Sequence, residues 1–450
     1  MKTVLLFSAA YIAAGVVIPD QNPMKPLIES SSSTPSTVSQ SVSSDSELEA
    51  DFVFSTSYAE EISNNVESMT AWALNLPHLP RPLRSEEETD MKNCDDESYK
   101  NGLDLNYPGH HDKPNKTTYQ LITSGEETSI FAKLVSQFDD IVDLLNSTDE
   151  SHTVLVPRDK ALEKAIHFHP PKEYVKKFVL YHILKKPATA RTIFHSRTIC
   201  TLLKQDELGD YDQRISTQFG VTGLTINYIA RIAKANLCAK NGIVHILDHL
   251  LLPPLQSSDT LSLVPSVFST LDFGLLKTGL YEKINDTSTH TGSTIFAPSN
   301  LAFRKLGPMV NAFLFSRWGE KYLRALLRYH IVFDHTLYSD AYHRPKKEED
   351  SSKTIHVDLP TLLDDRHLSI DIASFDRFAT MKINGFITVA SSDVIARDGV
   401  IHVLNDVLIP PKQPQDGNDH YNPLKEDGDE FAVPTVEDMI ERLGPFVQKD

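Results

Sequence analysis

The pattern of hydrophobic and polar residues predicts the same run of structural elements twice along the chain. Apolar residues at every third or fourth position indicate helices, and short β-branched runs bounded by turn residues indicate strands. The elements predicted in the first copy are a helical region at 130–145, a strand at 153–156, helices at 161–166 and 174–184, and strands at 224–229 and 242–252. The matching elements of the second copy are a strand at 294–297, a helix at 322–329 and a strand at 400–409. Because helices and strands do not alternate strictly, the pattern predicts an α+β fold.

Three short motifs mark the two copies and keep the same order in each. The motifs are Thr153–Pro157, Tyr181-His182 and Gly242–His245 in the first copy, and Thr294–Pro298, Tyr329-His330 and Gly399–His402 in the second. The offset between the copies grows from 141 residues at the first motif to 148 and then 157. Loop insertions between duplicated domains produce such growth, and so long a period indicates tandem domains rather than short stacked repeats.

With their neighbours, these motifs resemble the fasciclin-type domain family. The resemblance covers about residues 116–412 and includes the segments Asn241–Asp248 and Asp398–Asn405. It implies two tandem fasciclin-type domains, at 116–256 and 257–412. Each is expected to be a compact α+β domain, with a twisted β-sandwich-like sheet region and a helical subdomain. The resemblance implies no cofactor.

The resemblance also suggests a candidate interaction motif. In some animal members of the family the Tyr-His segment has been proposed as an adhesive site, which here corresponds to Tyr181, His182, Tyr329 and His330. The alternative is packing. Each pair lies at the end of an amphipathic helix, where a tyrosine can bury its ring and give its hydroxyl a partner. The histidine of each last motif lies in an otherwise apolar strand, which is typical of a core histidine with satisfied hydrogen bonds.

The first 18 residues predict a secretory signal peptide; a buried N-terminal helix or strand is the alternative. Met1-Lys2 gives a basic start, and the apolar run from Val4 to about Val17 ends among small residues. This run is shorter than the roughly 20 residues that span a bilayer, and the C-terminus lacks the hydrophobic tail of a GPI signal. The protein is therefore expected to be secreted, extracellular or in the cell wall, with the vacuole lumen as the alternative location.

The regions outside the two domains have their own composition. Residues 19–115 are rich in Ser, Thr and Pro near their start and are expected to be disordered, with one helix at 57–76. Residues 413–450 combine an acidic linker with an amphipathic helix, whose apolar stripe is expected to dock on the second domain. Thr435 is the expected N-cap of this helix, and Gly444-Pro445 is its expected end. In the first domain, Asp159 is a candidate N-cap.

Glycosylation sequons and cysteines fit a secretory route. The sequons begin at Asn115, Asn146 and Asn285. Cys200 and Cys238 lie in the same domain and are a candidate disulfide in an oxidising compartment, with two buried thiols as the alternative. Cys94 would then be left as an exposed or intermolecular thiol.

Charge and motifs exclude several functions. The formal net charge of −17 argues against binding nucleic acid and against docking on anionic lipid by charge. The sequence contains no nucleophile elbow, zinc helix, phosphate-binding glycine loop or Cys-x-x-Cys pair. His167-Phe168-His169 is followed by two prolines, and Glu426–Glu430 lacks the ligand spacing of a calcium loop, so solvated loops are expected there. The chain is therefore expected to be no enzyme and to bind no metal.

These observations lead to one main functional hypothesis and two alternatives. The main hypothesis is a non-enzymatic secreted glycoprotein with an adhesion or scaffold role, whose partners are proteins or glycans at the cell surface, in the matrix or in the vacuole. The first alternative is a vacuolar lumenal protein in trafficking or membrane organisation. The second is a small-molecule-binding or cyclase-like enzyme that uses a domain pocket.

Overall fold

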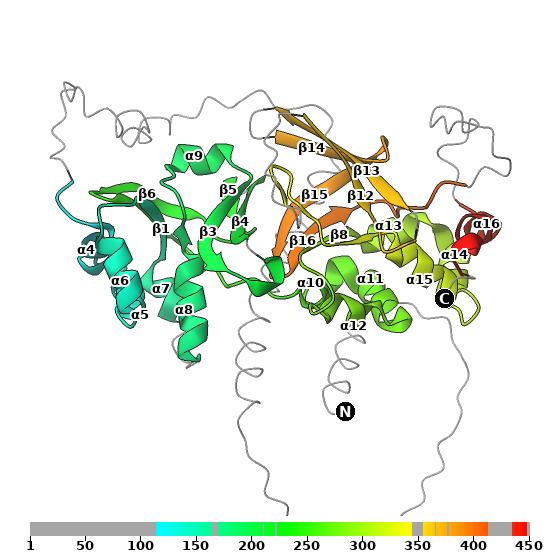
Figure 1. Ribbon diagram of the computed structural model, residues 1–450, viewed down its shortest axis with the longest axis horizontal. Coiled ribbons are helices and arrows are strands. Elements are labelled where there is room, and N and C mark those ends of the chain that lie inside the picture. Colours follow the sequence, from blue (N-terminus) through cyan, green and yellow to red (C-terminus); the bar gives the residue numbers. More distant parts are fainter. Residues whose placement is uncertain are drawn as a thin grey trace, which may run out of the picture. The chain divides into compact units, whose positions relative to one another are not determined.

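The structure is a computed structural model, shown in Figure 1. It describes residues 114–163, 170–209, 211–220, 223–343, 354–364, 366–375, 378–412 and 434–447. Within this part, the chain forms two seven-stranded sheets and one two-stranded sheet, together with helices. The predicted α+β class is confirmed. The signal peptide, the helix at 57–76, His167–His169 and the acidic linker lie outside the described residues.

Domain 1 starts with three short helices and continues into its sheet. Its elements are α4 (Thr118–Thr123), α5 (Ser129–Val135), α6 (Asp139–Asn146), β1 (His152–Pro157), α7 (Asp159–Glu163), α8 (Lys172–Tyr181), β2 (Ile183–Leu184), α9 (Ala190–His195), β3 (Thr198–Lys204), η3 (Asp206–Leu208), β4 (Asp212–Gly220), β5 (Gly223–Ile226), β6 (Ile232–Ala239) and β7 (Gly242–Leu247). The helix predicted at 174–184 ends at Tyr181, because Ile183 and Leu184 pair with β1 and β3 instead.

Domain 2 repeats this order with more helix before its first strand. Its elements are α10 (Ser257–Ser262), α11 (Pro265–Thr278), α12 (Leu280–Asn285), β8 (Ser293–Pro298), α13 (Asn300–Lys305), α14 (Gly307–Leu314), α15 (Glu320–Arg328), β9 (Ile331–Phe333), β10 (Thr336–Leu337), β11 (Tyr342–His343), β12 (Thr354–Pro360), β13 (His367–Phe375), β14 (Phe378–Ile383), β15 (Ile387–Ala396), β16 (Gly399–Leu404) and α16 (Val436–Val447). Both domains belong to one compact unit of the chain.

The two large sheets have the same cyclic strand order but are open at different joints. In domain 1 the order is β5-β4-β3-β2-β1-β7-β6, and in domain 2 it is β12-β13-β14-β15-β16-β8-β9. Let β8 match β1 and β16 match β7, with the other strands of each large sheet matched in chain order. If the two edge strands of each sheet are then joined into a ring, every strand has the same two neighbours in both domains. The ring of domain 1 is open between β5 and β6, whereas that of domain 2 is open between β9 and β12.

A parallel strand pair lies at the centre of each sheet and requires a glycine. β1 pairs with β7, and β8 pairs with β16, in parallel. A Cβ atom on Gly242 would lie 2.0 Å from the carbonyl oxygen of His152, and one on Gly399 would lie 2.1 Å from that of Ser293. The glycine that opens each last motif is therefore fixed by the close approach of the neighbouring strand.

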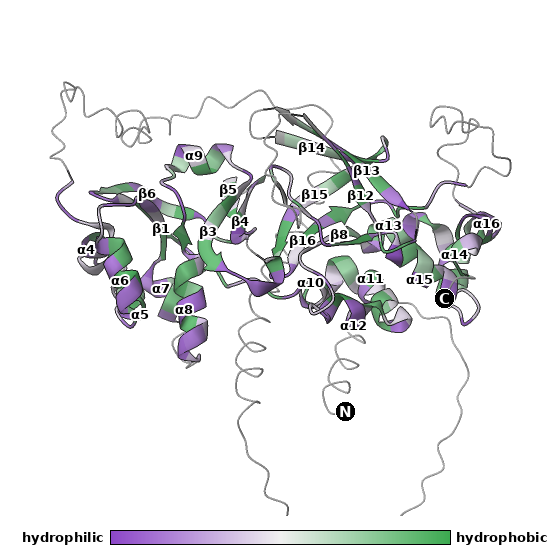
Figure 2. Cartoon of the chain, in the orientation of Figure 1, coloured by the Kyte–Doolittle hydropathy of each residue, from purple (hydrophilic) through white to green (hydrophobic). Residues whose placement is uncertain are grey.

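Both faces of these central strands are buried. On β1, Val154 and Val156 pack in the cluster formed with the helices, whereas Leu155 points into a second cluster that also contains Tyr181. Alternate residues of a strand face opposite sides of the sheet, so burial on both sides requires the unbroken apolar run seen in the sequence. The helices that cover the sheet are amphipathic, and Figure 2 shows the hydrophobic and hydrophilic faces of α8.

Asp159 caps a different helix from the one predicted. It is the first residue of α7, not its N-cap. Its carboxylate instead accepts hydrogen bonds from the backbone N–H groups of Ser129, at 3.2 Å, and Ile130, at 2.8 Å. These groups belong to the first turn of α5, whose own N-cap residue, Thr128, makes no side-chain cap. A residue 30 positions away therefore supplies the missing acceptor.

The C-terminal helix α16 packs on domain 2. Thr435 and Asp438 form the expected cap, since the backbone N–H of each donates to the side chain of the other, at 3.0 and 3.2 Å. Met439, Leu443 and Phe446 are buried in the core of domain 2. The prediction that Gly444-Pro445 ends the helix is wrong, because α16 continues to Val447. Burial of Phe446 holds the last turn in place.

Candidate functional site

The first Tyr-His pair makes a complete set of internal hydrogen bonds. The Nδ1 atom of His182 lies 2.8 Å from the carbonyl oxygen of Phe178, and its Nε2 accepts from the backbone N–H of Leu251 at 3.1 Å. These partners require the neutral ring with its proton on Nδ1. The Tyr181 hydroxyl donates to the carbonyl of Arg214 at 3.1 Å. The histidine thus joins the end of α8 to the segment after β7.

The second pair repeats this geometry. The Nδ1 atom of His330 lies 2.9 Å from the carbonyl oxygen of Leu326, and its Nε2 accepts from the backbone N–H of Leu408 at 2.9 Å. The Tyr329 hydroxyl lies 3.5 Å from its acceptor, the carbonyl oxygen of His367. Here the histidine joins the end of α15 to the segment after β16.

All four candidate residues of the interaction motif are buried. Tyr181 and His182 are 0% exposed, and Tyr329 and His330 are 1% exposed. Burial lowers the pKa of His182 and of His330 to about 4, so both rings are neutral at pH 7. The packing interpretation accounts for each of their hydrogen bonds, and none of the four side chains lies on the surface described by the structure.

The strand histidines are also fixed inside the domains. The Nε2 atom of His245 lies 2.9 Å from the carbonyl oxygen of Ala188, and that of His402 lies 2.7 Å from the carbonyl oxygen of Leu337. Burial lowers the pKa of His245 to about 4 and lowers that of His402 as well. Since a carbonyl oxygen only accepts, Nε2 carries the proton in both rings.

The partner of Nδ1 in these rings differs between the domains. In domain 1 the backbone N–H of Asn236 donates to Nδ1 of His245 at 3.2 Å, and in domain 2 that of Asp393 donates to Nδ1 of His402 at 3.4 Å. Asn236 and Asp393 have φ values of 55° and 62°. Domain 2 therefore places a carboxyl group where domain 1 has an amide, in the same left-handed backbone conformation.

Asp393 is a buried acid beside the interface between the domains. Its carboxylate accepts from the backbone N–H of Ser339 at 2.8 Å and also binds the Ser339 hydroxyl. Burial raises the pKa of Asp393; the positive form of His402 opposes this rise, and Asp340 adds to it. A buried carboxyl group with a neighbouring acid favours its protonated form.

The neighbouring acid, Asp340, binds across to domain 1. Its carboxylate accepts from the backbone N–H and the hydroxyl of Thr198, at 2.8 and 2.5 Å. The same hydroxyl accepts from Nε of Arg214 at 2.7 Å. Arg214 is 7% exposed, and its guanidinium lies 5.2 Å from the ring centre of Tyr338. A cation of domain 1 is thus enclosed by acidic and aromatic groups of domain 2.

A tyrosine of domain 1 completes this interface. Tyr228 follows β5, is 3% exposed and belongs to the core cluster of domain 2. Its hydroxyl donates to the carbonyl of Ser392 at 2.8 Å. Beside it, the Gln213 side chain donates to the carbonyl of Ala396 at 3.0 Å. Tyr228 has a φ of 69°, which is unusual for a bulky residue and is maintained here by its burial in the other domain.

The sequence did not reveal these interface residues. Thr198 and Asp340 are 142 positions apart, and Tyr228 contacts residues more than 160 positions away. Helical and strand periodicities act over a few residues and carry no information about such pairs.

The cysteines correct one prediction. Cys200 on β3 is a half-buried thiol, whereas Cys238 on β6 takes part in a disulfide. The candidate disulfide between Cys200 and Cys238 is therefore wrong. The two residues lie on strands that are separated in the sheet by β2, β1 and β7, which places their sulfur atoms too far apart to bond. Cys94 lies outside the described residues.

The three sequon asparagines differ in exposure. Asn115 is exposed, whereas Asn146 and Asn285 are partly buried. The Asn146 side chain accepts from the Thr117 hydroxyl at 2.8 Å, and the Asn285 side chain accepts from the Ser258 hydroxyl. Asn115 is thus the most accessible of the three, and glycosylation at these positions stays a prediction.

Neither a metal site nor a membrane span is found in the described part of the chain. No group of three or more His, Cys, Asp or Glu residues there could hold a metal ion. In the same residues, every helix is too short or too polar to cross a bilayer.

Comparison with known proteins identifies the family. The model described as "Fasciclin domain" matches residues 126–253 and 266–410. The chain belongs to this family, with two copies of the domain, and the predicted resemblance is confirmed. A search of solved structures finds a FAS1 domain pair from the insect cell adhesion molecule fasciclin I. It has 19% sequence identity and a TM-score of 0.32, and the match covers 62% of this chain and 96% of that chain.

Two relatives show the range of the family. "Aurofusarin biosynthesis cluster protein S" of Gibberella zeae is 32% identical over 364 residues, covering 76% of this chain and 88% of the relative. "Transforming growth factor-beta-induced protein ig-h3" of Sus scrofa is 26% identical over 262 residues, covering 58% of this chain. The match spans only 32% of the length of the pig protein.

Proposed function

We propose that this chain is a non-enzymatic, secreted glycoprotein that acts in adhesion or as a scaffold through its paired fasciclin domains. Fasciclin domains are typical of secreted and cell-adhesion proteins, and the family is generally non-enzymatic. The proposed partners are proteins or glycans at the cell surface or in the matrix.

The internal packing of the Tyr-His motif in both domains is the observation that supports this proposal best. The tyrosines and histidines of the Tyr-His motif bind backbone groups of their own domain. Their reactive atoms are thus already used in packing. Contacts with a partner would then be made by the outer surface of the domain pair.

Localisation and binding of the full chain test this proposal. An internal tag placed within 413–430 allows cell fractionation and endoglycosidase treatment without altering either terminus. We expect the glycosylated protein in the medium or cell wall, and we expect beads coated with it to bind cells or matrix. Cytosolic, unglycosylated protein would contradict the proposal.

The Tyr-His motif is tested separately, because it was a candidate adhesive site. In a Tyr329→Ala/His330→Ala variant, we expect a large loss of thermal stability, since two buried and hydrogen-bonded side chains are removed. Unchanged stability together with lost bead binding would instead establish the motif as adhesive.

A second candidate function is favoured by one relative. The fungal protein at 32% identity is named as a biosynthesis cluster protein. We therefore propose, as a second candidate, that this chain serves a biosynthetic pathway by binding a small molecule in a domain pocket or by acting as a cyclase-like enzyme. Thermal shift and turnover assays with candidate metabolites test this function. A third candidate, a role in trafficking in the vacuole lumen, predicts recovery of the tagged chain in the vacuolar fraction.

A further inference from the structure

Domain 2 exposes large apolar side chains where α11 meets the turn between α14 and α15. Phe273 is 50% exposed, Leu276 is 52% exposed and Trp318 is 79% exposed. Phe273 and Leu276 are three positions apart on α11, so they share a face of that helix. The Phe273 ring stacks on Phe315, with ring centres 5.7 Å apart. We call these four residues the turn patch.

An ion pair holds the turn next to α11. The Lys277 ammonium lies 3.0 Å from the carboxylate of Glu320, the first residue of α15. Trp318 precedes Glu320 by two residues, and Phe315 contacts α11 directly. The turn patch is therefore a single surface formed from both elements.

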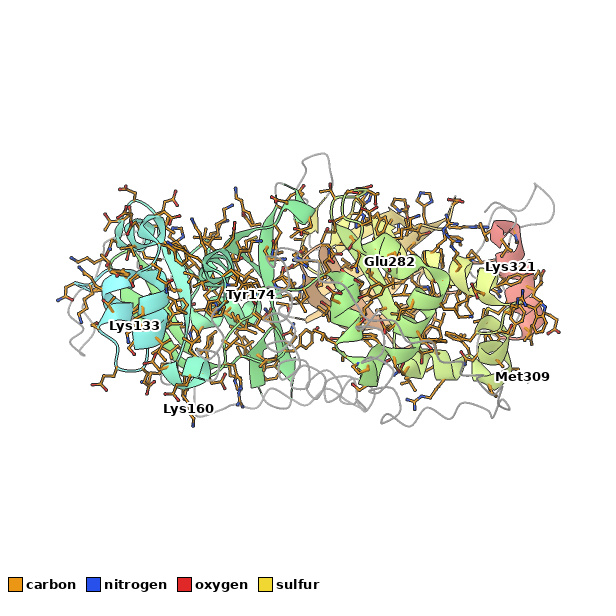
Figure 3. All side chains as sticks on the ribbon, turned by 90° about the horizontal axis from the view of Figure 1, so that it is seen from below. Lys133, Lys160, Tyr174, Glu282, Met309 and Lys321 are labelled. Atoms are coloured by element: carbon orange, nitrogen blue, oxygen red, sulfur yellow. The ribbon has the colours of Figure 1, made fainter. Side chains whose placement is uncertain are left out.

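Exposed cations border the turn patch. Arg317 is adjacent to Trp318 in sequence, and Lys321 and Arg324 lie three positions apart on α15. All three are exposed, and Figure 3 labels Lys321. The acid next to Lys321 in the sequence, Glu320, is already paired with Lys277. We call Arg317, Lys321 and Arg324 the basic rim.

The net charge of the whole chain does not describe this surface. Residues 114–412 contain 34 Lys and Arg against 33 Asp and Glu, so all of the negative net charge of −17 comes from the flanking regions. Charges in solution are screened over about 8 Å at physiological ionic strength. A surface that touches the turn patch therefore meets the basic rim, and the sequence-based argument against anionic lipid does not apply to it.

The chemistry of the turn patch favours a lipid surface as its occupant. Its most exposed residue, Trp318, lies on the turn between α14 and α15, where its indole can enter the headgroup region of a bilayer. Tryptophan is enriched at the level of lipid headgroups. Each Lys or Arg near the surface raises the affinity for an anionic bilayer about fivefold. We propose that the turn patch and the basic rim bind the surface of an anionic lipid bilayer.

Vesicle binding by the full-length secreted glycoprotein tests this proposal. We expect co-sedimentation with vesicles of phosphatidylcholine and phosphatidylserine at about 7:3, and little with phosphatidylcholine alone. Binding should weaken as salt is raised, because the basic rim is exposed. This inference goes beyond the proposed adhesion function, since vesicle binding can fail while the bead assay succeeds.

Tryptophan fluorescence reports on the contact itself. The chain has two tryptophans, Trp72 and Trp318. In a Trp72→Phe background, Trp318 is the sole tryptophan. We expect its emission to shift to shorter wavelength when anionic vesicles are added, because the indole leaves water. No shift, with vesicles pelleting the protein, would show that another surface binds.

Paired variants separate the turn patch from the rest of domain 2. Trp318→Ala should lower vesicle affinity by about tenfold, and Arg317→Glu/Lys321→Glu should remove most of the binding. The matched controls are Phe386→Ala, which removes another exposed aromatic residue, at 58% exposure, and Lys382→Glu on β14. Both controls should bind as the unchanged chain does. All five positions are exposed, so unchanged circular dichroism is expected in each variant.

Several results would overturn the proposal. These are no binding of the unchanged chain to anionic vesicles, equal binding to neutral vesicles, or equal loss in the control variants. Light scattering addresses a second copy of the chain as the occupant. A dimer that Trp318→Ala converts to a monomer, without vesicle binding, would assign the turn patch to self-association. Binding to an acidic protein but to no vesicle would likewise reject the lipid surface.

Discussion

Domain 1 and domain 2 hold their strand histidines in the same way, but the residue that binds Nδ1 is Asn236 in one and Asp393 in the other. The amide of Asn236 binds the backbone N–H of Ala190 at 2.8 Å, and no charge is needed. Asp393 binds Ser339 in the matching way but introduces an acid into a buried site. Domain 1 is thus chemically self-sufficient at this position.

Domain 2 acquires its compensating charge from domain 1. The guanidinium of Arg214 interacts electrostatically with Asp340 and Asp393, and both acids lie in domain 2. A buried acid without a partner is unfavourable, so Asp340 of domain 2, which binds Thr198, is better satisfied when domain 1 is in place. Duplicated domains can therefore keep one fold while one copy becomes dependent on the other.

The largest effect is expected when the tyrosine that domain 1 inserts into domain 2 is removed. Tyr228→Ala should lower the free energy of unfolding by about 3–5 kcal/mol, because a buried aromatic side chain is lost. Calorimetry should then show separate transitions for the two domains. Phe219→Ala, at a residue 42% exposed in domain 1, is the control and should change stability little. A single, barely shifted transition for Tyr228→Ala would contradict the shared core.

Acid should destabilise both domains through the Tyr-His histidines. The pKa of His182 and of His330 is about 4 in the folded protein against 6.5 for an ordinary histidine. The contribution of these neutral rings to the free energy of unfolding is therefore complete above pH 6.5. About 3 kcal/mol for each ring is lost as the pH falls towards 4. Urea unfolding between pH 7 and 4 measures this loss.

An exposed histidine gives the control for this titration. The hydrogen bond to Asp371 raises the pKa of His356. The small contribution of His356 to stability is therefore present at low pH and lost as the pH rises. His356→Gln should leave the acid-dependent loss unchanged, whereas His330→Gln should reduce its slope. The same slope in both variants would show that the buried rings are not responsible.

Exchanging the residues that distinguish the domains tests the comparison directly. Asn236→Asp should lower the free energy of unfolding by about 1–3 kcal/mol at pH 7, because it places an acid where domain 1 has an amide. This cost should shrink at low pH, where the carboxyl group is protonated. Asp393→Asn should cost less than about 1 kcal/mol, since burial already raises the pKa of Asp393 and disfavours its ionised form. Urea unfolding at pH 7 and pH 5 measures both, and equal costs would remove the distinction.

The motif tyrosines should differ modestly between the domains. The Tyr181 hydroxyl accepts from the Asn227 amide at 2.7 Å, whereas the Tyr329 hydroxyl accepts from the Asn384 amide at 3.1 Å. Tyr181→Phe should therefore lower the free energy of unfolding by about 1.5 kcal/mol, and Tyr329→Phe should lower it by about 0.5 kcal/mol. Chemical denaturation resolves this difference, and the reverse order would contradict it.

The smallest effect is expected from chemical labelling of the cysteines, which occur only outside domain 2. Alkylation of the unfolded protein without reductant should label Cys200 but not Cys238. Peptide mass spectrometry checks this result. Finding Cys200 linked to Cys238 would restore the original prediction.

Much of the fold could be predicted from the sequence because the signals were local. The run Thr153–Val156 is apolar on both faces, and β1 forms there. Predicted ends were less accurate where a neighbour intervened. Ile183 left the helical pattern to pair with β1, and Phe446 extended α16 beyond Pro445. Tertiary contacts outweigh the local preference at such positions.

The candidate site was predictable only in part. The sequence singled out Tyr181-His182 and Tyr329-His330, and their spacing from amphipathic helices indicated packing. It gave no sign that Tyr228 enters domain 2 or that Arg214 faces the acids of that domain. Those pairs are joined by topology alone.

By itself, the sequence determined the duplication, the family, the α+β class and the glycines of the last motifs, because each depends on residues within a few positions of one another. Only the tertiary structure decided which cysteine forms a disulfide, which helix Asp159 caps and how the two domains meet. It also brought the turn patch and the basic rim together on α11 and α15. The reason is physical: periodicity and turn chemistry act along the chain, whereas burial, charge compensation and close approach depend on segments that meet only after folding.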